Sequence, residues 1–141
     1  MKTLIFLTSL LVCSVVLADD HRAPGPVETW QCSLNEGKTM ADIRSVSKAV
    51  GEWSQSKGLN DAQWIFTPFS GDMTDSGRFI LMTAWSDFDG MGKALQGFFG
   101  EGEGEAIFAA FNAAATCTTR NFWTVETVFD NLPNCAPGLW S

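Results

Sequence analysis

Cys117-Thr-Thr-Arg-Asn-Phe-Trp-Thr-Val-Glu-Thr-Val-Phe129 is the stretch that decides the fold, because it is typical of a strand with large side chains on both faces. Successive side chains of a strand point to opposite sides, so Phe122 and Trp123 belong to different faces. A strand of this kind needs cover on both sides. We therefore expect a sheet with helices on one face and a second body on the other.

Residues 1–18 are typical of a secretory signal peptide. Lys2 precedes an apolar run that ends in Val16-Leu17-Ala18, where a signal peptidase finds the small residue it needs. The apolar run is too short for a transmembrane helix. We expect cleavage after Ala18, a secreted or periplasmic location, and no membrane partner after cleavage.

The remaining chain is expected to contain a single domain. Residues 19–26 form a polar lead-in, residues 27–129 the domain, and residues 130–141 a proline-containing tail. The net charge is −7 and the pI is about 4.5, with no basic cluster. This charge argues against nucleic acid and anionic membranes as partners.

Asp19-Asp20-His21 would become the new amino terminus. A free amine, two backbone amides and an imidazole at the third position can hold Cu(II) or Ni(II) in a square plane. The preferred interpretation is a flexible tail whose histidine has no role.

Hydrophobic periodicity divides the domain into alternating strands and helices. Thr39, with Asp42 three residues later, is an expected helix cap, and Ser86 is expected to cap the second helical region. The expected order is strand 27–34, helix 40–57, strands 61–69 and 78–85, an interrupted helical region 86–116, and strand 117–129. This α+β order predicts one ferredoxin-like βαββαβ unit with a four-stranded antiparallel sheet.

The expected topology bears on the cysteines. It places the first and last strands side by side and antiparallel at the sheet centre, so Cys32 approaches Cys117. A Cys32–Cys117 disulfide is therefore preferred, with Cys135 free or pairing between chains. The competing pair is Cys117–Cys135.

Apolar residues on the helix-free face of the sheet predict a partner. An exposed patch of this kind exceeds what ordinary monomers carry. The simplest way to bury this face is face-to-face homodimerisation into an α/β barrel. The alternative is that the long helical region or the tail folds over that face.

The tract Gly100-Glu-Gly-Glu-Gly-Glu105 interrupts the second helical region. It lacks a lysine and its carboxylates would repel phosphate, so it is not a phosphate-binding loop. We expect this tract to form a flexible acidic loop. The alternative is that it forms a lid over a pocket.

Three stretches carry a family resemblance: Cys32 to Asp42, Gln63 to Phe69, and Cys117 to Phe122. They resemble a group of secreted bacterial proteins similar to the dimeric α/β-barrel superfamily, which includes antibiotic-biosynthesis monooxygenases and haem-degrading enzymes. The resemblance implies the fold more than an activity. It also implies that an aromatic substrate, if there is one, lies between sheet and helices among Trp, Asn and Arg side chains. No histidine occurs from Val27 to Ser141, which disfavours His-ligated haem, and no cofactor is expected.

Several polar and aromatic residues are candidates for a site. A Trp/Asn/Arg trio could draw on Trp64 or Trp85, Asn112 or Asn121, and Arg78 or Arg120. The residues predicted to bind a ligand are Trp64, Trp85, Arg78, Asn121 and Trp123. Glu28 and Glu126, on neighbouring strands, would form a carboxylate pair if they share a face, but we expect both to lie in water near strand ends. The preferred interpretation of the abundant aromatic residues is that they build the core and the dimer interface, and a ligand cage is the alternative.

Three functional hypotheses follow. The first is a non-catalytic secreted dimeric domain that binds a small apolar or aromatic ligand. The second is a cofactor-independent monooxygenase acting on an aromatic compound, and the third is a metal-binding protein that uses Asp19-Asp20-His21. The first hypothesis is preferred.

Overall fold

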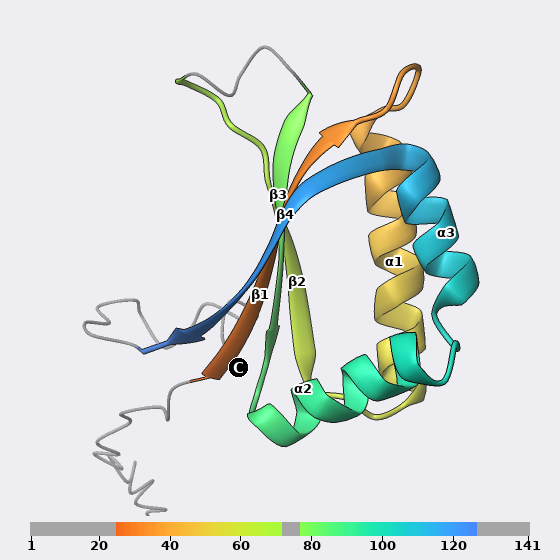
Figure 1. The fold of residues 1–141 in the computed structure, drawn as a ribbon, viewed down its shortest axis with the longest axis vertical. Coiled ribbons are helices and arrows are strands. Elements are labelled where there is room, and N and C mark those ends of the chain that lie inside the picture. The colour runs from red at the N-terminus through yellow and green to blue at the C-terminus, as the bar shows by residue number, and fades with distance from the viewer. Residues whose placement is uncertain (1–24, 72–76, 127–141) are drawn as a thin grey trace, which may run out of the picture.

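The computed structural model describes residues 25–71 and 77–126. Four strands and three α-helices alternate along this part of the chain, with a short π-helix, η1, following α2 (Figure 1). Their bounds are β1 Gly25–Leu34, α1 Met40–Ser56, β2 Asp61–Phe66, β3 Arg78–Trp85, α2 Phe88–Leu95, η1 Gln96–Gly100, α3 Glu105–Ala114 and β4 Ala115–Val125. Within the described residues, no helix is both long enough and apolar enough to span a bilayer.

The sheet confirms the predicted ferredoxin-like α+β fold. Its strand order is β2-β3-β1-β4, and every neighbouring pair is antiparallel. β1 and β4 lie side by side as expected, but β4 forms an edge, and the centre belongs to β1 and β3. The expectation of a central last strand was wrong, because β1 has β3 as its second neighbour. Helices α1 and α3 cover one face, and α2 runs from the lower end of the sheet to this helical layer (Figure 1).

The first turns of helices α1 and α2 are fixed by capping side chains close in the sequence. The backbone N–H of Thr39 donates to Asp42 Oδ2 at 2.8 Å, which confirms the expected cap of α1. This hydrogen bond lowers the pKa of Asp42. Helix α2 begins one residue later than expected: Asp87, not Ser86, is its cap, and its carboxylate accepts from the Gly90 N–H at 2.7 Å. A carboxylate also complements the positive end of the helix dipole.

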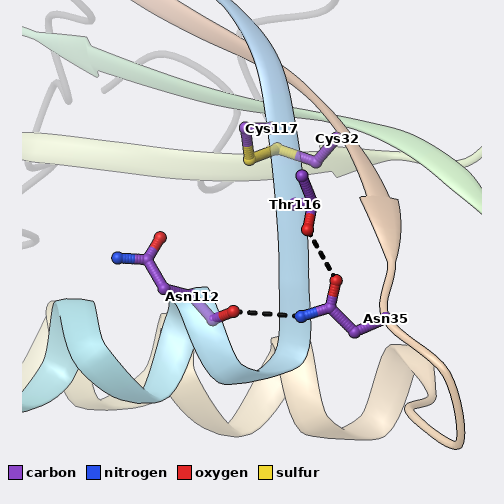
Figure 2. The surroundings of a disulfide bond; sticks show 5 residues. All are labelled: Cys32, Asn35, Asn112, Thr116 and Cys117. Atoms are coloured by element: carbon purple, nitrogen blue, oxygen red, sulfur yellow. Dashed lines mark hydrogen bonds between the residues drawn. A yellow bond between two sulfur atoms is a disulfide. The ribbon is translucent and has the colours of Figure 1, made fainter.

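The Cys32–Cys117 disulfide is present, as predicted, and joins β1 to β4 (Figure 2). The register of the two strands shifts between Gln31 and Cys32, so that Cys32 lies opposite Cys117 while Gln31 lies opposite Thr119. The shift leaves an extra residue in β4, which turns Cys117 towards the helices. Cys32 is 3% exposed and belongs to the core.

Asn35, close to this disulfide, joins the end of β1 to the end of α3 and the start of β4. Its Nδ2 donates to the backbone carbonyl oxygens of Asn112 at 3.0 Å and Ala113 at 3.2 Å, and its Oδ1 accepts from the Thr116 hydroxyl at 2.7 Å (Figure 2). A single side chain thus satisfies carbonyl groups at the end of α3 that lack helical partners. It also fixes the direction in which the chain enters β4.

The two faces of the sheet differ in character. On β3, Phe79, Leu81 and Trp85 point to the helices and are buried. On the opposite, helix-free face lie the exposed Phe66 and Trp123. The core of the domain therefore lies between the sheet and the helical layer.

Candidate functional site

A cavity of about 80 Å³, partly open to solvent, lies between the sheet and the helical layer. We call it the sheet–helix cavity. All described helices and strands β1, β2 and β3 contribute to it. Its lining consists of Glu28, Trp30, Val46, Ser47, Val50, Trp53, Asp61, Gln63, Leu81, Thr83, Trp85, Ala94, Leu95, Phe98, Phe99, Ile107, Phe108 and Phe111.

The helical side of the cavity is almost entirely apolar. Trp53 meets Phe98 edge-on with ring centroids 5.0 Å apart, and Phe99 meets Phe108 in the same way at 5.3 Å. Phe108 and Phe111 stack at 6.5 Å. Edge-to-face and offset contacts of this kind are the favoured arrangements of aromatic rings. The helices therefore form a wall of interlocked rings.

The sheet side of the cavity carries a band of polar groups. Gln63, Thr83 and Glu28 lie opposite one another on β2, β3 and β1, and the next row holds Asp61 opposite Trp85. Because directly opposed residues share a face, all of these side chains point towards the helices. A ligand in the cavity would meet polar groups on one side and rings on the other.

Two polar atoms of this band have no hydrogen-bond partner within the described part of the chain. They are Gln63 Oε1 and Trp85 Nε1, and both are buried. The other end of the Gln63 amide donates to Thr83 Oγ1 at 3.1 Å, which orients the side chain. Buried polar groups without partners are rare in proteins and costly. Both residues belong to the lining of the sheet–helix cavity.

Asp61 is a half-buried carboxylate at the edge of the same band. Burial raises its pKa, and the hydroxyl of Ser54, which donates to its Oδ1, only partly offsets this effect. Ser54 itself is 1% exposed. Desolvation thus makes Asp61 easier to protonate than an ordinary aspartate.

Glu28 and Arg120 form an ion pair across β1 and β4. The Glu28 side chain is 7% exposed and that of Arg120 34%. The guanidinium of Arg120 also lies over the rings of Trp30, Phe99 and Phe122, at 4.6, 5.1 and 4.9 Å from their centroids. Guanidinium groups over ring faces are attracted to them. Arg120 thus ties the edge strand to η1 while neutralising a buried carboxylate.

The Gly/Glu tract makes specific contacts beside the cavity. Glu103 accepts from Trp53 Nε1 at 3.0 Å and from Lys57 Nζ at 2.5 Å. The Lys57 ion pair and then the Trp53 hydrogen bond lower the pKa of Glu103. A Cβ atom on Gly104 would lie 2.4 Å from the Phe98 ring, so only glycine fits there. The tract is therefore anchored to α1 and packed on the cavity wall.

The residues predicted to bind a ligand fall on both faces of the sheet. Trp85 lines the sheet–helix cavity. Trp64, Arg78, Asn121 and Trp123 lie on the helix-free face, where Trp123 Nε1 donates to Thr29 Oγ1 at 2.7 Å. The structure therefore does not bring these four side chains together with Trp85.

The other candidates for the Trp/Asn/Arg trio, Arg120 and Asn112, do not lie together either. Arg120 lies beside the cavity through Glu28, whereas Asn112 is exposed at the end of α3. Glu28 and Glu126 do not form a carboxylate pair: Glu28 binds Arg120, and Glu126 is exposed beyond the end of β4. The expectation that both carboxylates lie in water near strand ends holds for Glu126 and was wrong for Glu28, which is buried and paired with Arg120.

Gln63, Asp61 and Thr83 were not singled out from the sequence. The available signal was strand parity, since all three share a face with Leu81 and Trp85. No cluster of His, Cys, Asp and Glu suited to a metal ion occurs in residues 25–71 and 77–126. Asp19, Asp20, His21 and Cys135 lie outside these residues, as do residues 1–18, for which a signal peptide is expected.

Comparisons with known proteins show the fold. No family model and no curated protein matches the sequence. Among solved structures, the chain is similar to SnoaB, a cofactor-independent oxygenase from Streptomyces nogalater, with 15% identity and a TM-score of 0.53 over 74% of this chain and 96% of SnoaB. A protein of unknown function from Nitrosomonas europaea also matches, with 15% identity and a TM-score of 0.49 over 79% of this chain and 97% of the other. The likeness to SnoaB shows that the chain shares its fold.

Proposed function

We propose that this protein binds a small, largely apolar aromatic molecule in the sheet–helix cavity. The observation that carries the proposal is the cavity itself: interlocked rings form its helical wall, and oriented polar groups form its sheet side. Ligand sites typically combine apolar walls with a few placed polar groups. Protein cores, by contrast, are close-packed and leave few voids larger than a water molecule.

The size of the cavity limits the ligand. An apolar cavity of about 150 Å³ holds benzene. A cavity of about 80 Å³ that opens to solvent therefore suits part of a single ring, with the remainder in the mouth. Single-ring compounds are the appropriate probes.

The second hypothesis, a cofactor-independent monooxygenase, requires the same cavity to hold its substrate. SnoaB is such an oxygenase, but at 15% identity the likeness supports the fold alone. Binding is therefore the proposal, and oxygen consumption on an activated phenol would be the observation that adds catalysis to it.

Filling the cavity should weaken ligand binding. Ala94 on α2 is 5% exposed and lines the cavity, so Ala94→Phe places a ring where the ligand would lie. We expect acetophenone binding, measured by calorimetry, to weaken at least about tenfold, because overlap with the ligand removes its buried contacts.

The matched control is Ala110→Phe, which adds the same ring to an exposed position of α3. It should leave binding unchanged. Circular dichroism establishes that both variants are folded. Equal binding by Ala94→Phe and the parent protein would contradict the proposal.

We also propose that the helix-free face of the sheet forms a homodimer. Phe66, Trp123 and Val125 are 50, 53 and 42% exposed on this face. Phe66 lies on the edge strand β2, and Trp123 and Val125 lie on the other edge strand, β4, so exposed apolar side chains occur at both edges of this face. Exposed apolar surface of this kind favours an interaction surface. A second copy of the same face would bury them and give each strand cover on both sides.

Phe66→Lys should weaken this dimer, because a charge would be buried in an apolar interface. Phe88→Lys is the matched control, since Phe88 is 55% exposed but lies on α2. Native mass spectrometry should show a dimer for the parent and for Phe88→Lys, with a dissociation constant at least about tenfold higher for Phe66→Lys. A monomeric parent protein at micromolar concentration would contradict this proposal.

A further inference from the structure

Trp85 Nε1 and Gln63 Oε1 are a hydrogen-bond donor and an acceptor without partners in the described residues. Trp85 is 7% exposed, so water does not readily satisfy its N–H. The two residues lie on adjacent strands and are offset by two positions, because Gln63 is opposite Thr83. Long side chains at such diagonal positions reach the same space. The two side chains can therefore reach the same part of the cavity lining.

The charges around the cavity constrain the ligand further. Glu28 and Asp61 are the titratable groups of its lining, and the lining contains no lysine, arginine or histidine. Arg120, the cation beside it, is already held by Glu28 and by the rings of Trp30, Phe99 and Phe122. An anionic ligand would meet carboxylates without a free cation, which costs free energy in a partly desolvated site.

We propose that the sheet–helix cavity selects neutral single-ring compounds that carry a carbonyl acceptor and an N–H or O–H donor on the same edge, of which an aromatic carboxamide is the simplest. The carbonyl accepts from Trp85 Nε1, and the N–H donates to Gln63 Oε1. The ring lies against Phe98, Phe99 and the other rings of the helical wall. This inference rests on the proposed binding function and adds the chemical class of the ligand.

Three probes of nearly equal size separate the contributions. Benzamide offers both acceptor and donor, acetophenone offers only the acceptor, and benzoate is an anion at neutral pH. We expect benzamide to bind about fivefold tighter than acetophenone, since one more buried hydrogen bond forms. Benzoate should bind more weakly than acetophenone. Calorimetry on the full secreted protein measures all three affinities.

Two substitutions assign the contacts. Trp85→Phe removes the donor and should weaken benzamide and acetophenone alike, by about tenfold. Gln63→Met removes the acceptor and should lower the affinity for benzamide to that for acetophenone, with acetophenone unaffected. The controls are Trp123→Phe on the opposite face and Gln31→Met at an exposed position of β1, and both should leave all affinities unchanged.

The outcomes separate this inference from the function on which it rests. If none of the probes binds, the proposed function fails and the inference fails with it. If the probes bind with equal affinity, or if benzoate binds best, the cavity is a ligand site but the inference about its ligand is overturned. If Trp85→Phe leaves the affinities for benzamide and acetophenone unchanged, or if Gln63→Met leaves benzamide the tighter ligand, the assignment of the two atoms is overturned.

Discussion

Replacement of both Cys32 and Cys117 by alanine is expected to lower the free energy of unfolding by about 4 kcal/mol. The disulfide joins residues 85 positions apart, so it removes a large part of the conformational freedom of the unfolded chain. Cys32 also packs in the core, where replacement by a smaller residue costs further stability. Urea unfolding followed by circular dichroism measures the difference.

The control for this experiment is Cys135→Ala. Because Cys117 is already paired with Cys32, the loss of Cys135 should leave the stability unchanged. Mass spectrometry of non-reduced tryptic peptides should show Cys32 linked to Cys117. A loss of less than about 1 kcal/mol for the double variant, or a Cys117–Cys135 peptide, would contradict the account.

Arg120→Met is expected to lower the free energy of unfolding by about 2–3 kcal/mol. The substitution leaves the Glu28 carboxylate buried without its cation, which is costlier than the loss of a surface pair. The Arg120 side chain is 34% exposed, so the effect falls below that of a fully buried pair. The contacts of the guanidinium with three rings are lost as well.

A double-mutant cycle isolates the pair itself. Glu28→Gln combined with Arg120→Met should cost at least about 1 kcal/mol less than the sum of the single variants, because neither charge is left unpaired. Lys48→Met is the matched control: its partner Glu52 is a surface residue, and no measurable loss is expected. Additive effects of Glu28→Gln and Arg120→Met would show that the pair does not act as a unit.

The fold followed from the sequence because strand periodicity and helix caps are local signals. Thr39 with Asp42, and the alternation of Phe122 with Trp123, depend on residues close in the chain. The Cys32–Cys117 pairing then followed from topology. The edge position of β4 did not, because strand order depends on which neighbours β1 acquires from far along the chain.

The site was harder to predict, because the face of the strand on which a residue lies, and not its residue type, decides whether it reaches the cavity. Trp64 and Trp123 are large and aromatic, but they lie on the helix-free face. Gln63, an inconspicuous residue in an apolar strand, lines the cavity instead. The Glu28–Arg120 pair depends on the register of β1 and β4, which a shift near Cys32 alters. No local pattern encodes that shift.

The most direct test of the central claim, that an aromatic ligand binds between the sheet and the helices, is a titration of ¹⁵N-labelled protein with benzamide. Each of the six tryptophans gives its own indole N–H signal in a ¹H–¹⁵N correlation spectrum. The account predicts that the Trp85 signal moves strongly, because its N–H gains a hydrogen-bond partner, while the Trp123 signal on the opposite face stays in place. A spectrum in which Trp123 moves and Trp85 does not would contradict it.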